Sequence, residues 1–139
     1  MHTLNNIFTS DLKQIKLEDG DVFHGIKKTD FGYKDFGEAY FSSIKFSRVK
    51  AWKKHTKMTM NLIVPLGEVK FVMTDGKNFQ EYILSRENYM RLTVPPMIWF
   101  GFQGRSDQDA LILNISDILH DPNEVIKCEL DKFSYDWSA

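Results

Sequence analysis

The chain has 139 residues and a formal net charge of −1, with 42% hydrophobic and 27% charged residues. This length and composition suit one compact domain with a buried core, which we expect to span residues 1–139. The near-zero charge favours neither nucleic acid nor an anionic membrane as a partner, and no apolar run has the length of a membrane span. The expected location is the cytoplasm, with which a lone cysteine, Cys128, agrees because it cannot form an internal disulfide.

Short apolar or alternating runs separated by turn residues follow one another along the chain, which is typical of β-strands. In chain order we expect strands at residues 22–26, 38–46, 61–65, 68–74, 79–84, 90–94 and 110–115. Leu66-Gly67 predicts a hairpin between the third and fourth of them, and Asp75-Gly76 predicts the next turn. Asp121 is a candidate N-cap for a helical turn over residues 122–126. Many short strands without a strong amphipathic helix predict a sandwich or barrel of the jelly-roll kind.

Two segments contain most of the side chains that suggest a site. The first runs from Lys50 to His55 (KAWKKH) and is followed by an apolar run to Gly67. The second runs from Val94 to Phe100 (VPPMIWF). Their spacing resembles the paired motifs of the cupins, in which strands of a small β-sandwich point side chains into a central cavity. The resemblance implies an all-β fold, a double-stranded β-helix (cupin, jelly-roll) sandwich.

The four metal-ligand positions of the metal-binding cupins fall on Lys53, His55, Met60 and Phe100 when the motifs are laid on this sequence. Of these side chains only His55 is suited to hold a metal, and a lysine ammonium in the same shell would repel a cation. We therefore expect no metal and no cofactor. The cavity is predicted to take an organic ligand, with His55 as its one side chain of a type that titrates near neutral pH.

Three stretches also resemble, in order, the cupin-fold sugar-nucleotide enzymes: 67–75, 92–102 and 114–124. This group includes the dTDP-4-dehydrorhamnose 3,5-epimerases and the dTDP-4-keto-6-deoxyglucose 3,4-ketoisomerases, whose Arg-Gly-Phe-His-x-His motif falls on Lys50 to His55. The resemblance implies a nucleotide-linked 4-keto-6-deoxy sugar as ligand and an isomerase that abstracts a proton next to its C4 ketone. It also implies a role in deoxysugar and polysaccharide biosynthesis and a homodimer.

The chain departs from these families at the catalytic positions. The epimerase's catalytic histidine falls on Lys53, its tyrosine acid falls on Leu113, and its supporting aspartate has no counterpart. Of the ketoisomerase's two histidines, the second is retained as His55. The resemblance therefore implies the fold and the ligand class more firmly than the reaction. A cupin that binds a sugar nucleotide or saccharide without catalysis stays the alternative.

Strand alternation predicts which side chains of the first segment enter the cavity. Residues two apart share a face, so Lys53 and His55 point inward together while Trp52 and Lys54 point the other way. We predict His55 as the catalytic base and Lys53 as its partner, because a positioned cation stabilises the charge that develops on a carbonyl oxygen. The alternatives are a lysine that bends into solvent and a histidine that is merely hydrogen-bonded within its strand.

Six further side chains are candidates for substrate binding: Lys50, Lys57, Arg91, Trp99, Met60 and Phe100. The basic ones would meet the two negative charges of a diphosphate, although lysines that guard a strand edge explain the same cluster. Aromatic rings at 99, 100 and 102 would stack on a base or sugar, although packing in the core is favoured for at least two of them. His120, Asp121 and Glu124 are interpreted first as turn residues.

Overall fold

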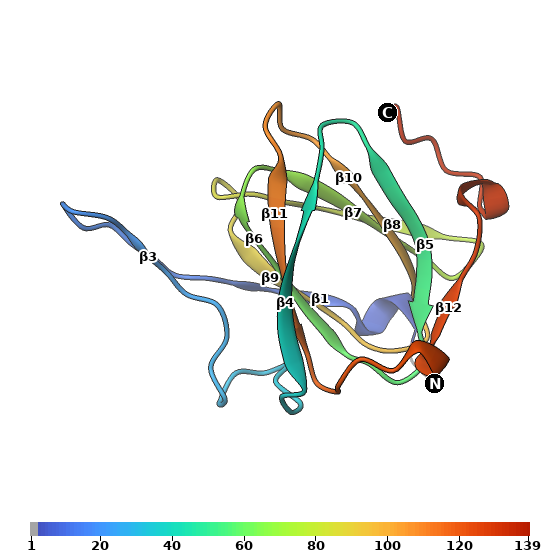
Figure 1. Ribbon diagram of the computed structural model, residues 1–139, viewed down its shortest axis with the longest axis horizontal. Helices are drawn as coiled ribbons and strands as arrows, with labels where there is room; N and C mark the ends of the chain where they lie inside the picture. Colours follow the sequence, from blue (N-terminus) through green and yellow to red (C-terminus); the bar gives the residue numbers. More distant parts are fainter. Residues whose placement is uncertain (1–2) are drawn as a thin grey trace.

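Two five-stranded antiparallel sheets form the body of the protein in the computed structural model, which describes residues 3–139. The strand order is β1-β9-β6-β11-β4 in the first sheet and β12-β5-β10-β7-β8 in the second. Figure 1 shows the two sheets facing each other around a common centre. This arrangement confirms the predicted all-β cupin sandwich.

The first sheet contains β1 (Phe8–Asp11), β4 (Glu38–Ile44), β6 (Met60–Leu66), β9 (Met90–Val94) and β11 (Ala110–Ser116). The second contains β5 (Val49–His55), β7 (Val69–Thr74), β8 (Phe79–Leu84), β10 (Trp99–Gly104) and β12 (Val125–Lys127). A two-stranded ribbon of β2 (Gln14–Ile15) and β3 (Val22–Phe23) projects from the body (Figure 1). The short 3-10 helices are η1 (Leu4–Asn6), η2 (Pro122–Glu124) and η3 (Leu130–Lys132). None of the helices described between residues 3 and 139 is long and apolar enough to cross a membrane.

Two predicted turns are confirmed. β7 and β8 pair as a hairpin, and the Asp75 carboxylate accepts hydrogen bonds from the N–H groups of Lys77 and Asn78 at 2.9 and 2.8 Å. The Asp121 carboxylate accepts from the N–H group of Asn123 at 2.9 Å and so caps η2. In both places a short acidic side chain satisfies backbone donors that the turn leaves without partners.

The hairpin predicted across Leu66-Gly67 is wrong, because β6 lies in the first sheet and β7 in the second. Both strands are buried runs of mostly apolar residues, so their pattern predicts strands but not the sheet that each one joins. Gly67, at φ +81°, turns the chain from one sheet to the other. A Cβ atom there would lie 2.7 Å from Cα of Ala110, which explains the glycine. The strand predicted at 22–26 is only the two-residue β3.

The core lies between the sheets and comes largely from the inward faces of β6, β7, β9 and β11. The nearly fully buried residues that these strands contribute include Leu62, Val64, Val69, Phe71, Met73, Leu92, Val94 and Ile112. Side chains this large each contribute about 1.5–3 kcal/mol when they are fully buried. This packing fixes the strands on which the site is built.

β5 contains a bulge at Trp52. Lys53 pairs with Phe100 and Ala51 pairs with Gly101, so Trp52 has no residue opposite it on β10. The strands approach so closely here that a Cβ atom on Gly101 would lie 2.5 Å from Cβ of Ala51. An extra residue in a strand shifts the alternation of side chains on either side of it. Lys50, which strict alternation would turn away, therefore lines the same inner pocket as Lys53.

Candidate active site

A cleft of about 660 Å³ opens between β4, β5 and the segment that leads from β11 into β12. Its lining is mostly polar or charged: Glu38, Tyr40, Lys53, His55, His120, Pro122, Val125 and Lys127. A smaller inner pocket of about 140 Å³ shares Tyr40 and Lys53 with the cleft and is otherwise lined mainly by apolar side chains. The two spaces have the shape expected of a binding site for an organic ligand, with a charged mouth and an apolar floor.

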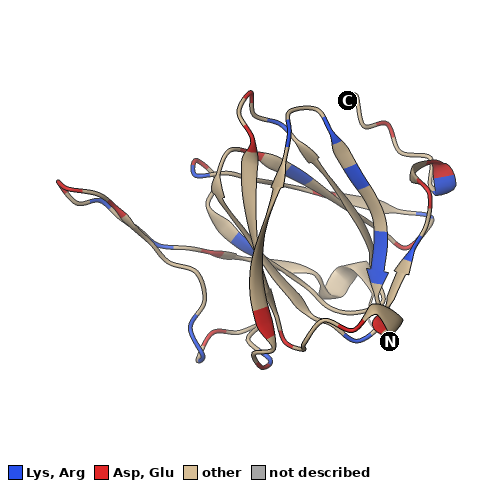
Figure 2. Cartoon of the chain, viewed as in Figure 1, with Lys and Arg blue, Asp and Glu red and all other residues tan. Residues whose placement is uncertain are grey.

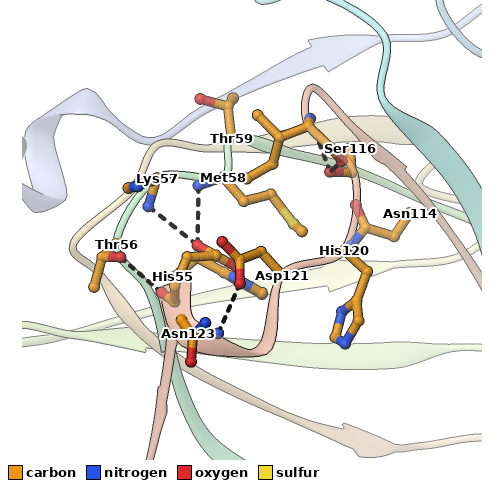
Figure 3. A network of polar contacts seen from close by, with 12 residues as sticks. His55, Thr56, Lys57, Met58, Thr59, Asn114, Ser116, His120, Asp121 and Asn123 are labelled. Carbon is orange, nitrogen blue, oxygen red and sulfur yellow. Dashed lines mark hydrogen bonds and ion pairs between the residues drawn. The ribbon is translucent and has the colours of Figure 1, made fainter.

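His55 and Glu124 form a buried pair at the wall of this cleft. Nδ1 of His55 lies 2.5 Å from Oε1 of Glu124, and the two residues are only 8% and 2% exposed. The other carboxylate oxygen, Oε2, accepts hydrogen bonds from the N–H groups of Lys57 and Met58 at 3.1 and 3.2 Å. Figure 3 shows those two N–H groups beside His55, next to the segment that carries His120. Glu124 is thus held from three sides.

The protonation of this pair follows from the environment of Glu124. Burial alone would raise the pKa of Glu124, but the hydrogen bonds from His55 and from the N–H groups of Lys57 and Met58 bring that pKa below its ordinary value. An ionised carboxylate only accepts hydrogen bonds, so Nδ1 of His55 carries the proton. In the neutral ring the lone pair is then on Nε2. This is the tautomer that a general base requires.

The segment from His120 to Glu124 brings the carboxylate to this place. The main-chain oxygen of Glu124 accepts hydrogen bonds from the N–H group and the hydroxyl of Thr56, at 2.8 and 2.7 Å. Val125 then pairs with His55 as β12 begins. The interpretation of this segment as a turn is correct for Asp121 but missed the role of Glu124. Glu124 lies 69 residues from His55, so no spacing in the sequence connects them.

Lys53 lies on the same wall as His55, as the alternation along β5 predicts, and its side chain is exposed at the mouth of the cleft. Partial burial first, and then the charges of Lys127 and Lys50, lower the pKa of Lys53 from its ordinary value. Figure 2 shows basic segments along β5 at this side of the body. The wall is therefore positively charged, which suits an anionic ligand.

Tyr40 on β4 also lines the cleft, although no motif in the sequence singles it out. Its hydroxyl accepts a hydrogen bond of 2.9 Å from Nδ2 of Asn114, which leaves the hydroxyl proton available to a ligand. In the resemblance to the epimerases, the position of the tyrosine acid falls on Leu113. Leu113 pairs with Phe41, and the next pair along the two strands is Asn114 with Tyr40. Because side chains alternate along a strand, Asn114 and Tyr40 face the cavity and Leu113 faces away from it. Tyr40 is thus the phenol at this site.

Three of the six predicted binding residues line the cavities. Lys50, Met60 and Phe100 all border the inner pocket. Phe100 stacks on His55 with ring centroids 5.8 Å apart, and Nζ of Lys50 donates to the main-chain oxygen of Ser43 at 2.9 Å. The structure therefore brings these three residues together with Lys53 and His55.

Lys57, Trp99 and Arg91 line neither the cleft nor the inner pocket, so the structure does not bring these three predicted binding residues together with His55. The side chain of Lys57 is exposed, and only its N–H group contacts Glu124. Trp99 precedes Phe100 on β10 and so faces the opposite side, where its ring packs 5.5 Å from that of Phe133.

Arg91 lies on β9 in the other sheet and is 2% exposed. Its guanidinium donates to the main-chain oxygens of Gly25 and Phe31 at 3.0 and 3.1 Å and pairs with Asp30 at 3.3 Å. A buried arginine with these partners anchors the loop that leads into β4 rather than a ligand. Across residues 3–139 no three side chains of His, Cys, Asp or Glu are grouped as metal ligands.

Proteins of known structure share this architecture. The structure resembles the dTDP sugar isomerase from Desulfovibrio desulfuricans G20, with a TM-score of 0.90 and 34% identity over 96% of this chain and 91% of that one. It also resembles a mutant of the 3,4-ketoisomerase QdtA from Thermoanaerobacterium thermosaccharolyticum in complex with TDP-4-keto-6-deoxyglucose (TM-score 0.79, 18% identity, 91% and 90% of the two chains).

A third similar structure is the dTDP-4-dehydrorhamnose 3,5-epimerase from Elizabethkingia anophelis NUHP1 (TM-score 0.81, 15% identity, 100% and 85% of the two chains). No curated protein matches the sequence. The profile of the FdtA family, described as WxcM-like, C-terminal, matches residues 7–135. That match spans nearly all of the chain, including both walls of the cleft, and the chain therefore belongs to the FdtA (WxcM-like, C-terminal) family.

Proposed function

We propose that the protein is an isomerase that moves a proton next to the C4 ketone of a nucleotide-linked 4-keto-6-deoxy sugar, in deoxysugar or polysaccharide biosynthesis. The observation that carries the proposal is the His55–Glu124 pair, a base held in one tautomer at the wall of a cleft of substrate size. Family membership supports it, as do the names of the 34%-identical isomerase and of the ketoisomerase complex with TDP-4-keto-6-deoxyglucose.

The proton transfer begins at His55. Its Nε2 atom takes the proton from the carbon next to the ketone, and Glu124 stabilises the imidazolium that forms. Stacking on Phe100 and the bond to Glu124 fix the plane of the ring, so the base is oriented before the substrate binds. A well-placed general base of this kind contributes about 10²–10⁴-fold to a rate.

The charge that develops on the ketone oxygen needs a partner, and Lys53 is on the same wall of the cleft. One preorganised donor to such an oxygen contributes about 3–4 kcal/mol. Tyr40, on the opposite wall, can return a proton to the sugar from its other side. Lys50 and Lys127 are available to the diphosphate. The proposed chemistry uses side chains of this chain alone and needs no metal or cofactor.

A homodimer is part of the proposal. The β2–β3 ribbon projects from the body (Figure 1) and exposes Leu17 and Val22, while Phe31 near its base is 82% exposed. Apolar side chains gathered on a projecting element are typical of a surface that another chain covers. Light scattering after gel filtration tests this directly, because the mass of a single chain in solution would contradict it.

The function is tested by incubating the protein with dTDP-4-keto-6-deoxyglucose in heavy water and following deuterium at C3 and C5 by NMR. We expect exchange well above a control without protein. Calorimetric titration with the same sugar nucleotide measures binding separately. Clear binding with no enzyme-dependent exchange would refute the isomerase and favour the second candidate, a non-catalytic cupin. The observation in favour of that candidate is Lys53, which occupies the position of a histidine in the related enzymes.

A further inference from the structure

Lys53 occupies a special position among the cavities. A third space of about 500 Å³ lies against β5, β10 and the end of β12 and is bordered by Lys50, Lys53, Lys127 and Cys128, among others. Of the residues from 3 to 139, Lys53 alone borders this space, the cleft and the inner pocket. A ligand in any one of these spaces would therefore lie beside Lys53.

Two other lysines flank this amino group. Lys127 on β12 is paired directly opposite Lys53, so their side chains share a face. Lys50 is brought to the same side by the bulge at Trp52. The ion pairs within residues 3–139 do not involve Lys53. No carboxylate neutralises its ammonium group, and the neighbouring cations disfavour that charged form.

Such surroundings favour a nucleophilic lysine. A neutral amine attacks carbonyl carbons, and desolvation or an adjacent cation is the usual means of making the neutral form available. The pKa of Lys53 is lowered by partial burial, Lys127 and Lys50, in that order, which acts in the same direction. Lys50 is less available for this chemistry, because its ammonium donates to Ser43 and lies 6.0 Å from the centre of the Phe102 ring.

We propose that Lys53 forms an imine with the ketone of the substrate, so that the proton removed by His55 comes from an iminium rather than from a free ketone. This inference rests on the proposed function and deepens it, because it gives Lys53 a covalent role in place of that of a donor to the ketone oxygen. Nζ bonds to the carbonyl carbon, the C–O bond breaks, and the oxygen leaves as water with one proton from the amine and one from solvent. The cationic iminium then loses its α-proton to Nε2 of His55 and becomes a neutral enamine.

The covalent step also selects the type of reaction. If the proton returns to the carbon it left, from either face, the iminium is restored and water releases the sugar from Lys53. If the proton went to C4 instead, the sugar would stay attached through a C–N single bond that water does not cleave. An imine at Lys53 therefore fits an epimerase and does not fit a 3,4-ketoisomerase.

Trapping with borohydride tests the proposal. The full-length protein is incubated with dTDP-4-keto-6-deoxyglucose, reduced with sodium borohydride, and examined by intact mass and peptide mapping. We expect one sugar-nucleotide adduct per chain on the peptide that contains Lys53. The variant Lys53→Arg keeps the charge but lacks the nucleophile and should give no adduct, while Lys54→Arg, on the outer face of the same strand, should give the full amount. Thermal melting of both variants verifies that they fold.

The same samples separate this inference from the proposed function. Deuterium exchange that persists without any adduct, and that survives in Lys53→Arg, would overturn the imine and leave the isomerase standing. An adduct on Lys53 without enzyme-dependent exchange would support the imine and contradict the isomerase. An adduct located on Lys50 or Lys127 would also overturn the assignment to Lys53.

Discussion

The two faces of β5 have different roles although they come from the same seven residues. The outer face buries Trp52, whose Nε1 donates to the main-chain oxygen of Leu130 at 3.0 Å and whose ring packs against Phe133 and Trp137. The inner face presents Lys53 and His55 to the cleft. A polar site is thus rigid when the back of its strand is packed, because the backbone that carries the base cannot shift.

The largest effect is expected on the inner face. His55→Asn should lower enzyme-dependent deuterium exchange by about 10²–10⁴-fold, because the proton acceptor is lost while the strand behind it stays packed. NMR of the sugar nucleotide in heavy water measures the rate. Lys54→Ala on the outer face is the matched control and should keep the wild-type rate. Exchange by His55→Asn at the control's rate would remove His55 from the mechanism.

On the outer face the expected effect is on stability. Trp52 is 1% exposed, and Trp52→Ala should reduce the free energy of unfolding by about 3–5 kcal/mol, because it leaves a large cavity beneath the C-terminal segment. Urea denaturation followed by circular dichroism measures the change. A loss below about 1 kcal/mol, which is typical of a surface substitution, would show that this face does not hold the strand.

The ionisation of Glu124 makes the stability of the protein depend on pH. Its pKa is lowered in the folded protein from the ordinary 4.5, so its contribution to stability is complete above that value and is lost as the pH falls through the lowered pKa. Glu124→Gln should cost about 1–3 kcal/mol at neutral pH, because a charge-assisted hydrogen-bond acceptor is removed.

The difference in unfolding free energy between wild type and Glu124→Gln should shrink as the medium is acidified, since the wild-type carboxyl then also becomes neutral. Urea denaturation at a series of pH values measures this difference. The exposed Glu87→Gln is the control and should show little change at any pH. A cost for Glu124→Gln that stays constant down to acid conditions would contradict the assignment of an ionised carboxylate.

The smallest effect is expected at Lys54. Its ammonium lies 5.0 Å from the centre of the Trp99 ring on the outer face, and a contact that is partly open to solvent contributes about 0.5–1 kcal/mol. Lys54→Ala should therefore lower the free energy of unfolding by no more than that in the urea experiment. A cost comparable with that of Trp52→Ala would mean that the outer face depends on charge rather than on packing.

The sequence predicted most of the strands because burial imposes a readable pattern on each of them. It also placed Lys53 and His55 on one face, since alternation is a local property. Three features escaped it for a common reason. The sheet that β7 joins, the bulge that turns Lys50 inward and the approach of Glu124 to His55 all depend on segments that meet only after folding. No glycine or proline in KAWKKH marks the bulge.

The close approach of Ala51 and Gly101 limits which substitutions the cleft can accept during evolution. A larger side chain at either position would separate the two strands and remove the offset that turns Lys50 inward. Related sequences should therefore show covariation between these two positions, with a gain of volume at one matched by a loss at the other. Randomised libraries aimed at new ligand selectivity would need to vary them as a pair.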